Sequence, residues 1–328
     1  MCYIGLIVLF VVNSVLAKNI LRYNLEDASK HFETFRRTYN KEYDGTEKAL
    51  RFEIFVKNLE KINELNEGSD SPVFGITQFS DLTSEEFVQM YSGYKSDNRT
   101  AYLIDRSAME EHYIARDIPE SFDWRDKKVV GEVKNQGQCQ CCWAFAVTGN
   151  LESAYAIKHN QSVRLSEQQL VDCDKMCSGC NGGNVGVACE YLRQCGSMTE
   201  DKYPYEERDN VCRYNSTNIR VKVKSCRAIQ VTEDELAYQL YSIGPLMIGV
   251  NSEKLQPYRG GLLTDCKAGE INHAILLVGY GTDEDGNKYW LAKNSWGTVF
   301  GEHGYLRMLR GVNCLNLMAE PAITAVVE

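Results

Sequence analysis

Apolar and polar residues follow two different periods along this chain. In the first third the apolar positions recur every three or four residues, which predicts amphipathic helices over 25–40 and 46–66. The segment Gly-Ser-Asp-Ser-Pro at 68–72 interrupts this pattern. Residues 74–79 then alternate enough to predict a short strand, and residues 81–87 have the composition of a capped helix start.

The remainder of the chain has helical patterns first and strand patterns later. Helices are predicted over 142–159, over 166–172 with Ser166 as the cap, and over 185–195 before Gly196. After Gly244-Pro245, short strand-like runs follow at 246–250, 273–279, 288–293 and 304–308. This order predicts an α+β protein with two lobes.

The first residues have a character of their own. An apolar run at 4–12 is followed by Val15-Leu16-Ala17, the small-residue pattern that a signal peptidase cuts. We therefore expect residues 1–17 to be a cleaved secretory signal, although no Lys or Arg precedes the run and a retained anchor is the alternative. No other stretch approaches the ~18 apolar residues of a membrane span, so no stable membrane insertion is expected.

Composition narrows the class of protein. The 328 residues are 44% apolar and 25% charged, as in ordinary globular proteins, and the net charge of -9 argues against a nucleic-acid partner. The chain has 13 cysteines, none of them between residues 18 and 117. This change in cysteine content predicts a domain boundary near residue 117. Secretion would permit disulfides, and it makes the sequons at Asn98, Asn160 and Asn215 candidate glycosylation sites.

A candidate nucleophile stands at the start of the 142–159 helix. Cys142 directly precedes Trp143, and a helix N-terminus lowers a thiol pKa. His273 and then Asn294 follow at the spacing, about 130–150 residues, of a Cys-His-Asn site. Cys141 is the competing candidate. Neighbours on a helix point about 100° apart, and the position just before Trp favours Cys142.

Several further motifs occur in a fixed order. Residues 118–125 read Ile-Pro-Glu-Ser-Phe-Asp-Trp-Arg. Six positions reproduce the ERFNIN pattern, namely Glu47, Arg51, Phe55, Asn58, Ile62 and Asn66. Gly75, Phe79 and Asp81 match a G-x-N-x-F-x-D motif in which Thr77 replaces Asn. With these motifs the chain resembles a papain-family (cathepsin L-like) cysteine protease precursor.

The resemblance implies a papain-like α+β fold. A helical lobe and a β-barrel-like lobe would form a peptidase domain at 118–328 with the active site between them, preceded by a helical inhibitory pro-domain at 18–117. The stretches 203–206, 221–226 and 272–274 further resemble baculovirus-type viral cathepsins. That similarity would imply degradation of host tissue.

The resemblance also implies roles for residues. Cys142 would be the nucleophile, His273 the base, Asn294 its orienter, and Gln136 an oxyanion donor together with the Cys142 N–H. The substrate-binding residues would be Gly182, Gly183, Asn272 and Trp296, with the last also shielding the His–Asn contact. The pocket for the residue two places before the scissile bond would be lined by Val185, Gly249, Ile271 and Ala319. These small or apolar residues predict a preference for Leu, Val or aromatic side chains.

For the cysteines, the resemblance implies the disulfides Cys139–Cys180, Cys173–Cys212 and Cys266–Cys314. Besides Cys142, this leaves Cys141, Cys177, Cys189, Cys195 and Cys226. A bridge within the 185–195 helix is excluded because six residues rise by ~9 Å. A bridge between Cys141 and Cys177 stays open. No second Cys pair or His cluster completes a zinc site with Cys177-x-x-Cys180, so neither a metal nor a cofactor is expected.

Three departures from the family pattern stand out. Gln140-Cys141 replaces Gly-Ser, which leaves substrate access and specificity open. Phe300 replaces Trp, and Leu315-Asn316 replace Gly-Ile, both of which indicate packing changes.

The leading hypothesis is a secreted, monomeric cysteine endopeptidase that acts on proteins, in a secreted or lysosome-like acidic compartment (of a host cell if viral). Its own pro-segment would block the cleft until the segment is removed under acidic conditions. The alternatives are an inactive relative acting as inhibitor or decoy, and a thiol acyltransferase or amidase.

Overall fold

The structure is a computed structural model that describes residues 21–67, 73–97 and 118–328. Its α-helices are α1 (Ala28–Thr38), α2 (Gly45–Glu67), α3 (Ser84–Tyr91), α5 (Cys142–His159), α6 (Glu167–Cys173), α7 (Val185–Cys195) and α8 (Glu233–Ile243). Its strands are β1 (Phe122–Asp123), β2 (Ser197–Met198), β3 (Ile219–Val221), β4 (Val223–Ile229), β5 (Leu246–Val250), β6 (Leu262–Leu263), β7 (His273–Thr282), β8 (Lys288–Lys293), β9 (Tyr305–Leu309) and β10 (Ala322–Val327). The predicted signal at 1–17, Asn98 and the predicted boundary at 117 lie outside the described residues or at their edge.

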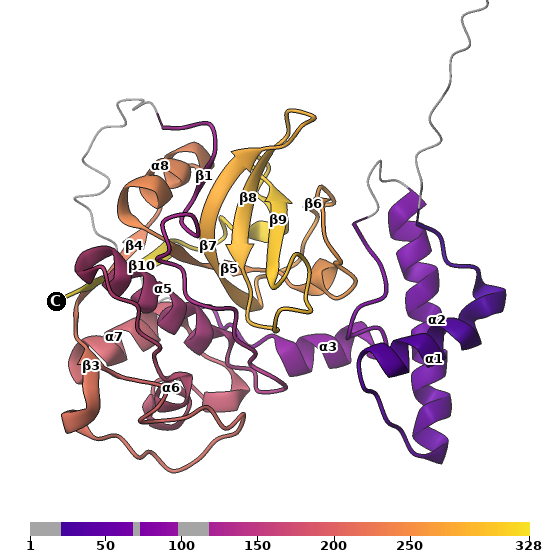
Figure 1. Ribbon diagram of the computed structural model, residues 1–328, viewed down its shortest axis with the longest axis horizontal. Helices are drawn as coiled ribbons and strands as arrows, with labels where there is room; N and C mark the ends of the chain where they lie inside the picture. The colour runs from indigo at the N-terminus through magenta and orange to yellow at the C-terminus, as the bar shows by residue number, and fades with distance from the viewer. Residues whose placement is uncertain (1–20, 68–72, 98–117) are drawn as a thin grey trace, which may run out of the picture.

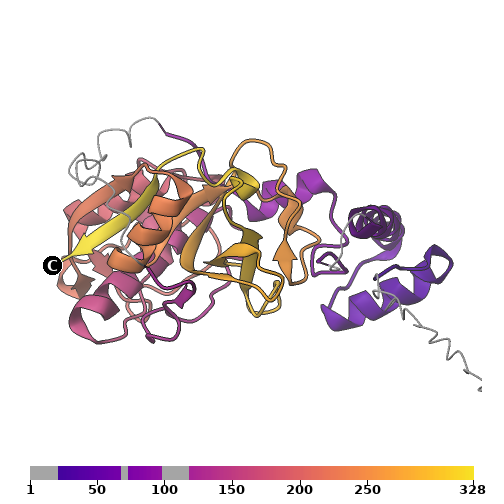
Figure 2. The same ribbon diagram turned by 90° about the horizontal axis from the view of Figure 1, so that it is seen from above.

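The helices α1 and α2 form a small unit at one end of the molecule, as Figures 1 and 2 show. Their shared core is aromatic and contains Phe32, Phe35 and Phe55 with Leu59. The predicted helices at 25–40 and 46–66 are confirmed, with the first beginning as a 3₁₀ turn at Leu25–Asp27. Helix α3 connects this unit to the rest of the chain.

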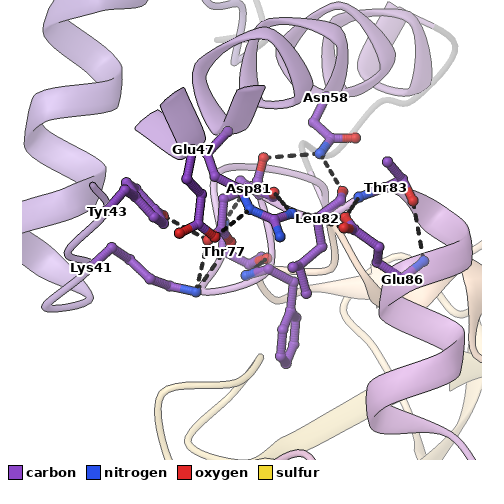
Figure 3. Close-up of polar contacts among 12 residues, drawn as sticks. Lys41, Tyr43, Glu47, Asn58, Thr77, Asp81, Leu82, Thr83 and Glu86 are labelled. Carbon is purple, nitrogen blue, oxygen red and sulfur yellow. Dashed lines mark hydrogen bonds and ion pairs between the residues drawn. The ribbon is translucent and has the colours of Figure 1, made fainter. Parts of the chain in front are cut away.

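Polar contacts fix α2 to the segment that leads into α3 (Figure 3). Arg51 Nη1 on α2 donates to the Glu86 carboxylate at 2.9 Å and to the Asp81 carbonyl at 3.2 Å. The Asp81 carboxylate accepts from Lys41 and Tyr43, while Asn58 Nδ2 donates to the carbonyls of Ser80 and Leu82. Arg51 and Asn58, two polar members of the ERFNIN motif, therefore satisfy backbone carbonyls of the loop before α3.

The strand predicted at 74–79 is wrong. The structure has there a turn closed by Ser80 N–H to the Thr77 carbonyl at 3.1 Å, and a single bridge from Phe74 to Tyr258. Phe74 and Phe79 are both buried in a cluster with residues of the β-lobe, so the apolar pattern at 74–79 reflects burial without a strand. The helix start predicted just after it is confirmed, since Thr83 and Glu86 form a capping box on α3.

The helical lobe is built around α5, whose residues from Cys142 to Ser153 are all buried. Helices α6 and α7 have the predicted positions, with Ser166 and Asn184 as N-caps. Lys134 joins this lobe to the loop that follows β1, through ion pairs to Glu152 at 2.7 Å and Glu167 at 2.6 Å. These pairs anchor the loop that carries Gln136.

The β-lobe is a mixed sheet with the strand order β4-β10-β5-β7-β8-β9-β6, and β1 pairs with β7. The four strand-like runs of the sequence correspond to β5, β7, β8 and β9. Strands β4 and β10 and helix α8 were not predicted. β10 lies between β4 and β5, which joins the chain end to residues about a hundred positions earlier. In the described residues, no helix combines the length and apolarity needed to span a membrane.

Four disulfides cross-link the peptidase part. Cys139–Cys180, Cys173–Cys212 and Cys266–Cys314 join the pairs that the resemblance implied. The fourth, Cys189–Cys226, ties α7 to β4 and was not predicted. The bridge left open between Cys141 and Cys177 does not form. The Cys141 sulfur lies 3.0 Å from Tyr205 Oη, and the Cys177 thiol donates to the Asn184 carbonyl at 3.8 Å.

Candidate active site

Three elements bring the predicted catalytic side chains together. Cys142 is the first residue of α5, His273 is the first residue of β7, and Asn294 directly follows β8. β7 pairs with β8 in the sheet, and α5 packs against β7, so residues far apart in sequence meet where the two lobes touch. All three side chains are buried.

The histidine has a defined tautomer. Its Nε2 lies 2.8 Å from Asn294 Oδ1, and the same oxygen accepts from the Ser295 backbone N–H. Because that oxygen can only accept, the proton of a neutral imidazole resides on Nε2. Nδ1 is then the basic nitrogen, and it has no hydrogen-bond partner among the residues that the structure describes. Trp296 stacks on the ring, with centroids 4.5 Å apart, and shields the His273–Asn294 contact from solvent.

Burial shifts the pKa values of both Cys142 and His273 in the direction that favours their neutral forms. Burial raises the pKa of the Cys142 thiol to about 12, although backbone groups of Ala274, Trp143 and Tyr94 lower it in part. Burial also lowers the pKa of His273 to about 4, against the raising effect of Asn294. In this state both groups are neutral between these two values.

Gln136 lies in the loop before α5 and is fully buried. Its Nε2 donates to the carbonyls of Cys139 at 3.0 Å and Tyr91 at 3.1 Å, and its Oε1 accepts from Ser295 Oγ at 2.7 Å. The Tyr91 carbonyl also accepts from Trp296 Nε1 at 3.1 Å. The Tyr91 carbonyl oxygen therefore accepts a hydrogen bond from Gln136 Nε2, the group that was predicted to bind the oxyanion.

The segment after α3 passes through the predicted substrate cleft as an extended chain. Gly183 N–H donates to the Gly93 carbonyl and its carbonyl accepts from Lys95 N–H, both at 2.9 Å, which makes a parallel bridge. On the other side, the Asn272 carbonyl accepts from Gly93 and Tyr94 N–H at 2.9 Å. A Cβ on Gly182 would lie 2.6 Å from the Gly93 carbonyl, so a residue without a side chain is required there.

Tyr94 fills the predicted specificity pocket. Its ring contacts Gly249, where an added Cβ would lie 3.1 Å from the ring, and it packs in one buried cluster with Val185 and Ile271. Its hydroxyl donates to Glu320 and accepts from Asn184 Nδ2 at 3.2 Å. Ala319 is exposed, and the neighbouring Glu320 provides the contact that had been expected from this segment.

The remaining predicted residues are placed as follows. Gln140 is half-buried and its side-chain amide donates to the Gln89 carbonyl of α3. Asn160 and Asn215 are exposed, Asn160 in a left-handed backbone conformation and Asn215 as the cap of a 3₁₀ turn at Ser216–Asn218.

Sequence reasoning missed two groups of residues at this site. Glu320 was passed over because only the apolar side chains near it were taken as pocket lining. Tyr91 ends the short helix α3, Gly93 and Tyr94 come just after it, and none of them belongs to a motif. A signal existed in the spacing, since they come about ten residues after Asp81, at the end of the helix that the capping box starts.

Comparison with known proteins identifies two families. Residues 118–326 match the papain family of cysteine proteases, and residues 32–87 match the cathepsin propeptide inhibitor domain.

Among curated relatives, the viral cathepsin of Adoxophyes honmai nucleopolyhedrovirus is 38% identical over 338 residues, covering 98% of this chain and 99% of the relative. That of Autographa californica nuclear polyhedrosis virus is 40% identical over 312 residues, covering 94% and 95%.

Solved structures agree with these sequences. A digestive procathepsin L proteinase from Tenebrio molitor larval midgut has a TM-score of 0.83 at 33% identity, covering 91% of this chain and 99% of its own. The precursor of recombinant stem bromelain has a TM-score of 0.79 at 32% identity, with coverage of 92% and 99%. The predicted papain-like α+β fold is thus confirmed.

Proposed function

Because this chain belongs to the papain family of cysteine proteases and carries a propeptide inhibitor domain, we propose that it is a zymogen whose Cys142, His273, Asn294 and Gln136 hydrolyse peptide bonds. The observation that carries this proposal is the hydrogen bond from His273 Nε2 to Asn294 Oδ1, which leaves Nδ1 as the base.

The reaction follows from these positions. With the cleft open to water, the desolvation that keeps both groups neutral is relieved, and His273 takes the Cys142 proton to give a thiolate–imidazolium pair. The thiolate attacks the substrate carbonyl carbon, and the oxyanion accepts hydrogen bonds from Gln136 Nε2 and the Cys142 N–H. His273 protonates the leaving amine, then activates the water that releases the acyl group from sulfur.

Residues 91–95 support inhibition by the chain's own pro-segment. They occupy the oxyanion donor, pair with Gly183 and fill the pocket at Gly249. A backbone group of Tyr94 also contributes to the electrostatics at Cys142, where it lowers the thiol pKa against the raising effect of burial.

The pocket at Gly249 supports a preference for an apolar or aromatic residue two positions before the scissile bond. Tyr94 is a natural occupant of the same space. Since Glu320 receives the hydroxyl of that tyrosine, we expect tyrosine to be accepted at least as well as phenylalanine. Rapid cleavage restricted to substrates with Arg at this position would contradict the proposal.

The relatives named viral cathepsin support a role in protein degradation during infection. We propose that the chain enters the secretory pathway by a signal at 1–17, is glycosylated, and is activated as a monomer in acidic surroundings by loss of residues 18–117. The mature enzyme would be the 118–328 domain.

The test compares variants on a dipeptidyl fluorogenic amide. The full-length chain is processed with pepsin, so that activation does not depend on the variant. Cys142→Ala should abolish hydrolysis, and Gln136→Ala should lower kcat by about 10²–10³-fold. An active Cys142→Ala enzyme would overturn the assignment of the nucleophile. A wild-type chain that is alkylated at Cys142 yet cleaves no amide would favour the alternative of an inactive relative.

A further inference from the structure

Gln140 packs against the pro-segment just before the segment enters the pocket at Gly249. Its backbone N–H donates to the Cys180 carbonyl at 3.2 Å, which ties it to the 3₁₀ turn that ends at Gly182. Gly93 packs closely against both residues. A Cβ added to Gly93 would lie 2.6 Å from the Gln140 Cβ, and a Cβ added to Gly182 would lie 2.6 Å from the Gly93 carbonyl. Of the two residues that line the cleft here, only Gln140 carries a side chain.

Gly93 marks the place of the substrate residue whose carbonyl is attacked. On one side of it along the chain, the Tyr91 carbonyl accepts a hydrogen bond from Gln136, the proposed oxyanion donor. On the other side, Tyr94 fills the pocket proposed for the residue two places before the scissile bond. A substrate that reaches both places has to pass where Gly93 lies, whichever way its chain runs. The residue that lies there is the one directly before the scissile bond.

The Gln140 side chain extends from this place toward α3. Its amide N–H donates to the Gln89 carbonyl, which belongs to the last turn of α3, where carbonyls have no partner within the helix. Loss of the pro-segment removes this acceptor but leaves the side chain beside the place of Gly93. Glycine at position 140, as in the family pattern, would leave the same space open.

We propose that Gln140 makes the enzyme select a small residue, such as glycine or alanine, directly before the scissile bond. The proposal rests on the proposed function, since it concerns the substrates of that reaction. The selection is steric, because a large substrate side chain has to displace the Gln140 side chain or turn out of the cleft. Either change weakens binding of the transition state. Together with the pocket at Gly249, Gln140 would then select two adjacent residues of one substrate.

The experiment varies only the residue directly before the scissile bond. Four fluorogenic peptidyl amides carry Gly, Ala, Phe or Arg at this position, and all carry tyrosine one position earlier. Wild-type, Gln140→Gly, Gln140→Ala and Gln140→Met chains are produced at full length and processed with pepsin, and kcat/KM is measured for each substrate. Gln140→Met keeps nearly the length and volume of the side chain without its hydrogen bonds. The rate of Cys142 alkylation by iodoacetamide is measured in parallel, because this reagent needs the thiolate but carries no peptide.

For the wild-type enzyme we expect kcat/KM to be about ten-fold higher with Gly or Ala than with Phe or Arg. Gln140→Gly and Gln140→Ala should raise kcat/KM for the Phe and Arg substrates about ten-fold, while the value for the Gly substrate and the alkylation rate stay within about two-fold of wild type. Gln140→Met should keep the wild-type preference. The matched control is Gln138→Gly, which adds backbone freedom two residues earlier at an exposed side chain and should leave the preference unchanged.

Three results would overturn the proposal. One is the same ratio between the Gly and Phe substrates in the wild-type, Gln140→Gly and Gln140→Ala enzymes. Another is loss of the preference in Gln140→Met, which would assign it to hydrogen bonding by the amide instead of to size. The third is an equal change in Gln138→Gly, which would assign it to the backbone of the loop. Failure of the proposed function looks different, because the wild-type enzyme would then be alkylated at Cys142 yet cleave none of the four amides.

Discussion

The pro-segment and the peptidase domain are stabilised by different kinds of interaction. Residues 21–67 and 73–97 contain no cysteine and are held by an aromatic core and by polar contacts around Asp81 (Figure 3). The peptidase domain has four disulfides and most of the residues of two large buried clusters, which Tyr94 and the segment around Phe79 also join. Under the proposed function, non-covalent contacts suit a segment that is removed on activation, and covalent cross-links suit a domain that remains among proteases.

The two regions meet at the proposed cleft, where aromatic and polar side chains of the pro-segment contact the peptidase domain. Phe79 and Phe87 pack edge-on against Trp296, with ring centroids 5.4 and 5.3 Å apart. Thr77, which replaces the Asn of the motif, donates to the Gln256 carbonyl at 2.7 Å. This departure from the pattern thus serves the contact between the regions.

The largest expected effect concerns the reactivity of Cys142 in the two states. At pH 6–7 the raised pKa leaves almost no thiolate in the pro-form, so alkylation by iodoacetamide should be at least about 10³-fold slower than in the processed enzyme. Mass spectrometry of labelled peptides measures this, with Cys195 on α7 as the internal reference. Equal labelling of Cys142 in both forms would mean that the pro-segment does not cover the thiol.

The next effect concerns the contribution of one disulfide, Cys189–Cys226, to the stability of the peptidase domain. Replacing both Cys189 and Cys226 by Ala removes a cross-link between residues 37 positions apart. We expect the free energy of unfolding in urea to fall by about 3 kcal/mol, mainly because the unfolded chain gains freedom. Cys195→Ala in the same helix is the control and should change it by about 0.5 kcal/mol or less. A double variant as stable as its parent would show that this bridge adds nothing to the fold.

A smaller effect should appear as a pH dependence of the pro-form. The folded state holds the pKa of His273 at about 4, below its ordinary 6.5. The unfolded chain therefore binds the proton more readily, so this contribution to stability is present above pH 6.5 and is lost as the pH falls toward 4. Between pH 7 and pH 5 we expect a loss of about 2 kcal/mol.

The measurement is urea unfolding of the full chain carrying Cys142→Ala, which prevents self-cleavage. Adding His273→Gln should remove this part of the pH dependence. His159→Gln changes an exposed histidine and should not. An identical loss of stability in the His273→Gln chain would place the pH dependence in other groups.

The smallest effect is expected within the pro-segment. Arg51→Ala removes the contacts to Glu86 and to the Asp81 carbonyl, which should destabilise the segment by about 1–2 kcal/mol. Pepsin should then remove the pro-segment about ten-fold faster, because partial opening becomes more frequent. The control, Arg37→Ala, changes an exposed arginine of α1. Equal rates for the two variants would contradict a stabilising role of the Arg51 contacts.

Much of the molecule could be predicted from local patterns. The helices α2, α5 and α7 follow from the spacing of apolar residues, and α3 and α6 from their capped starts at Thr83 and Ser166, because those signals depend only on near neighbours in the chain. The order of the motifs indicated the family. The candidate catalytic residues could be named for the same reason, since each stands in a short and distinctive segment.

Only the tertiary structure decided what depends on contacts distant in sequence. The pairing of Cys189 with Cys226 follows from α7 packing on β4, and the place of β10 in the sheet follows from its two neighbours. The same holds for Tyr94 against Glu320 and for Ser295 against Gln136, which are 226 and 159 positions apart. Such pairs cannot be predicted from local sequence patterns, because the packing of the two lobes determines which distant residues come into contact.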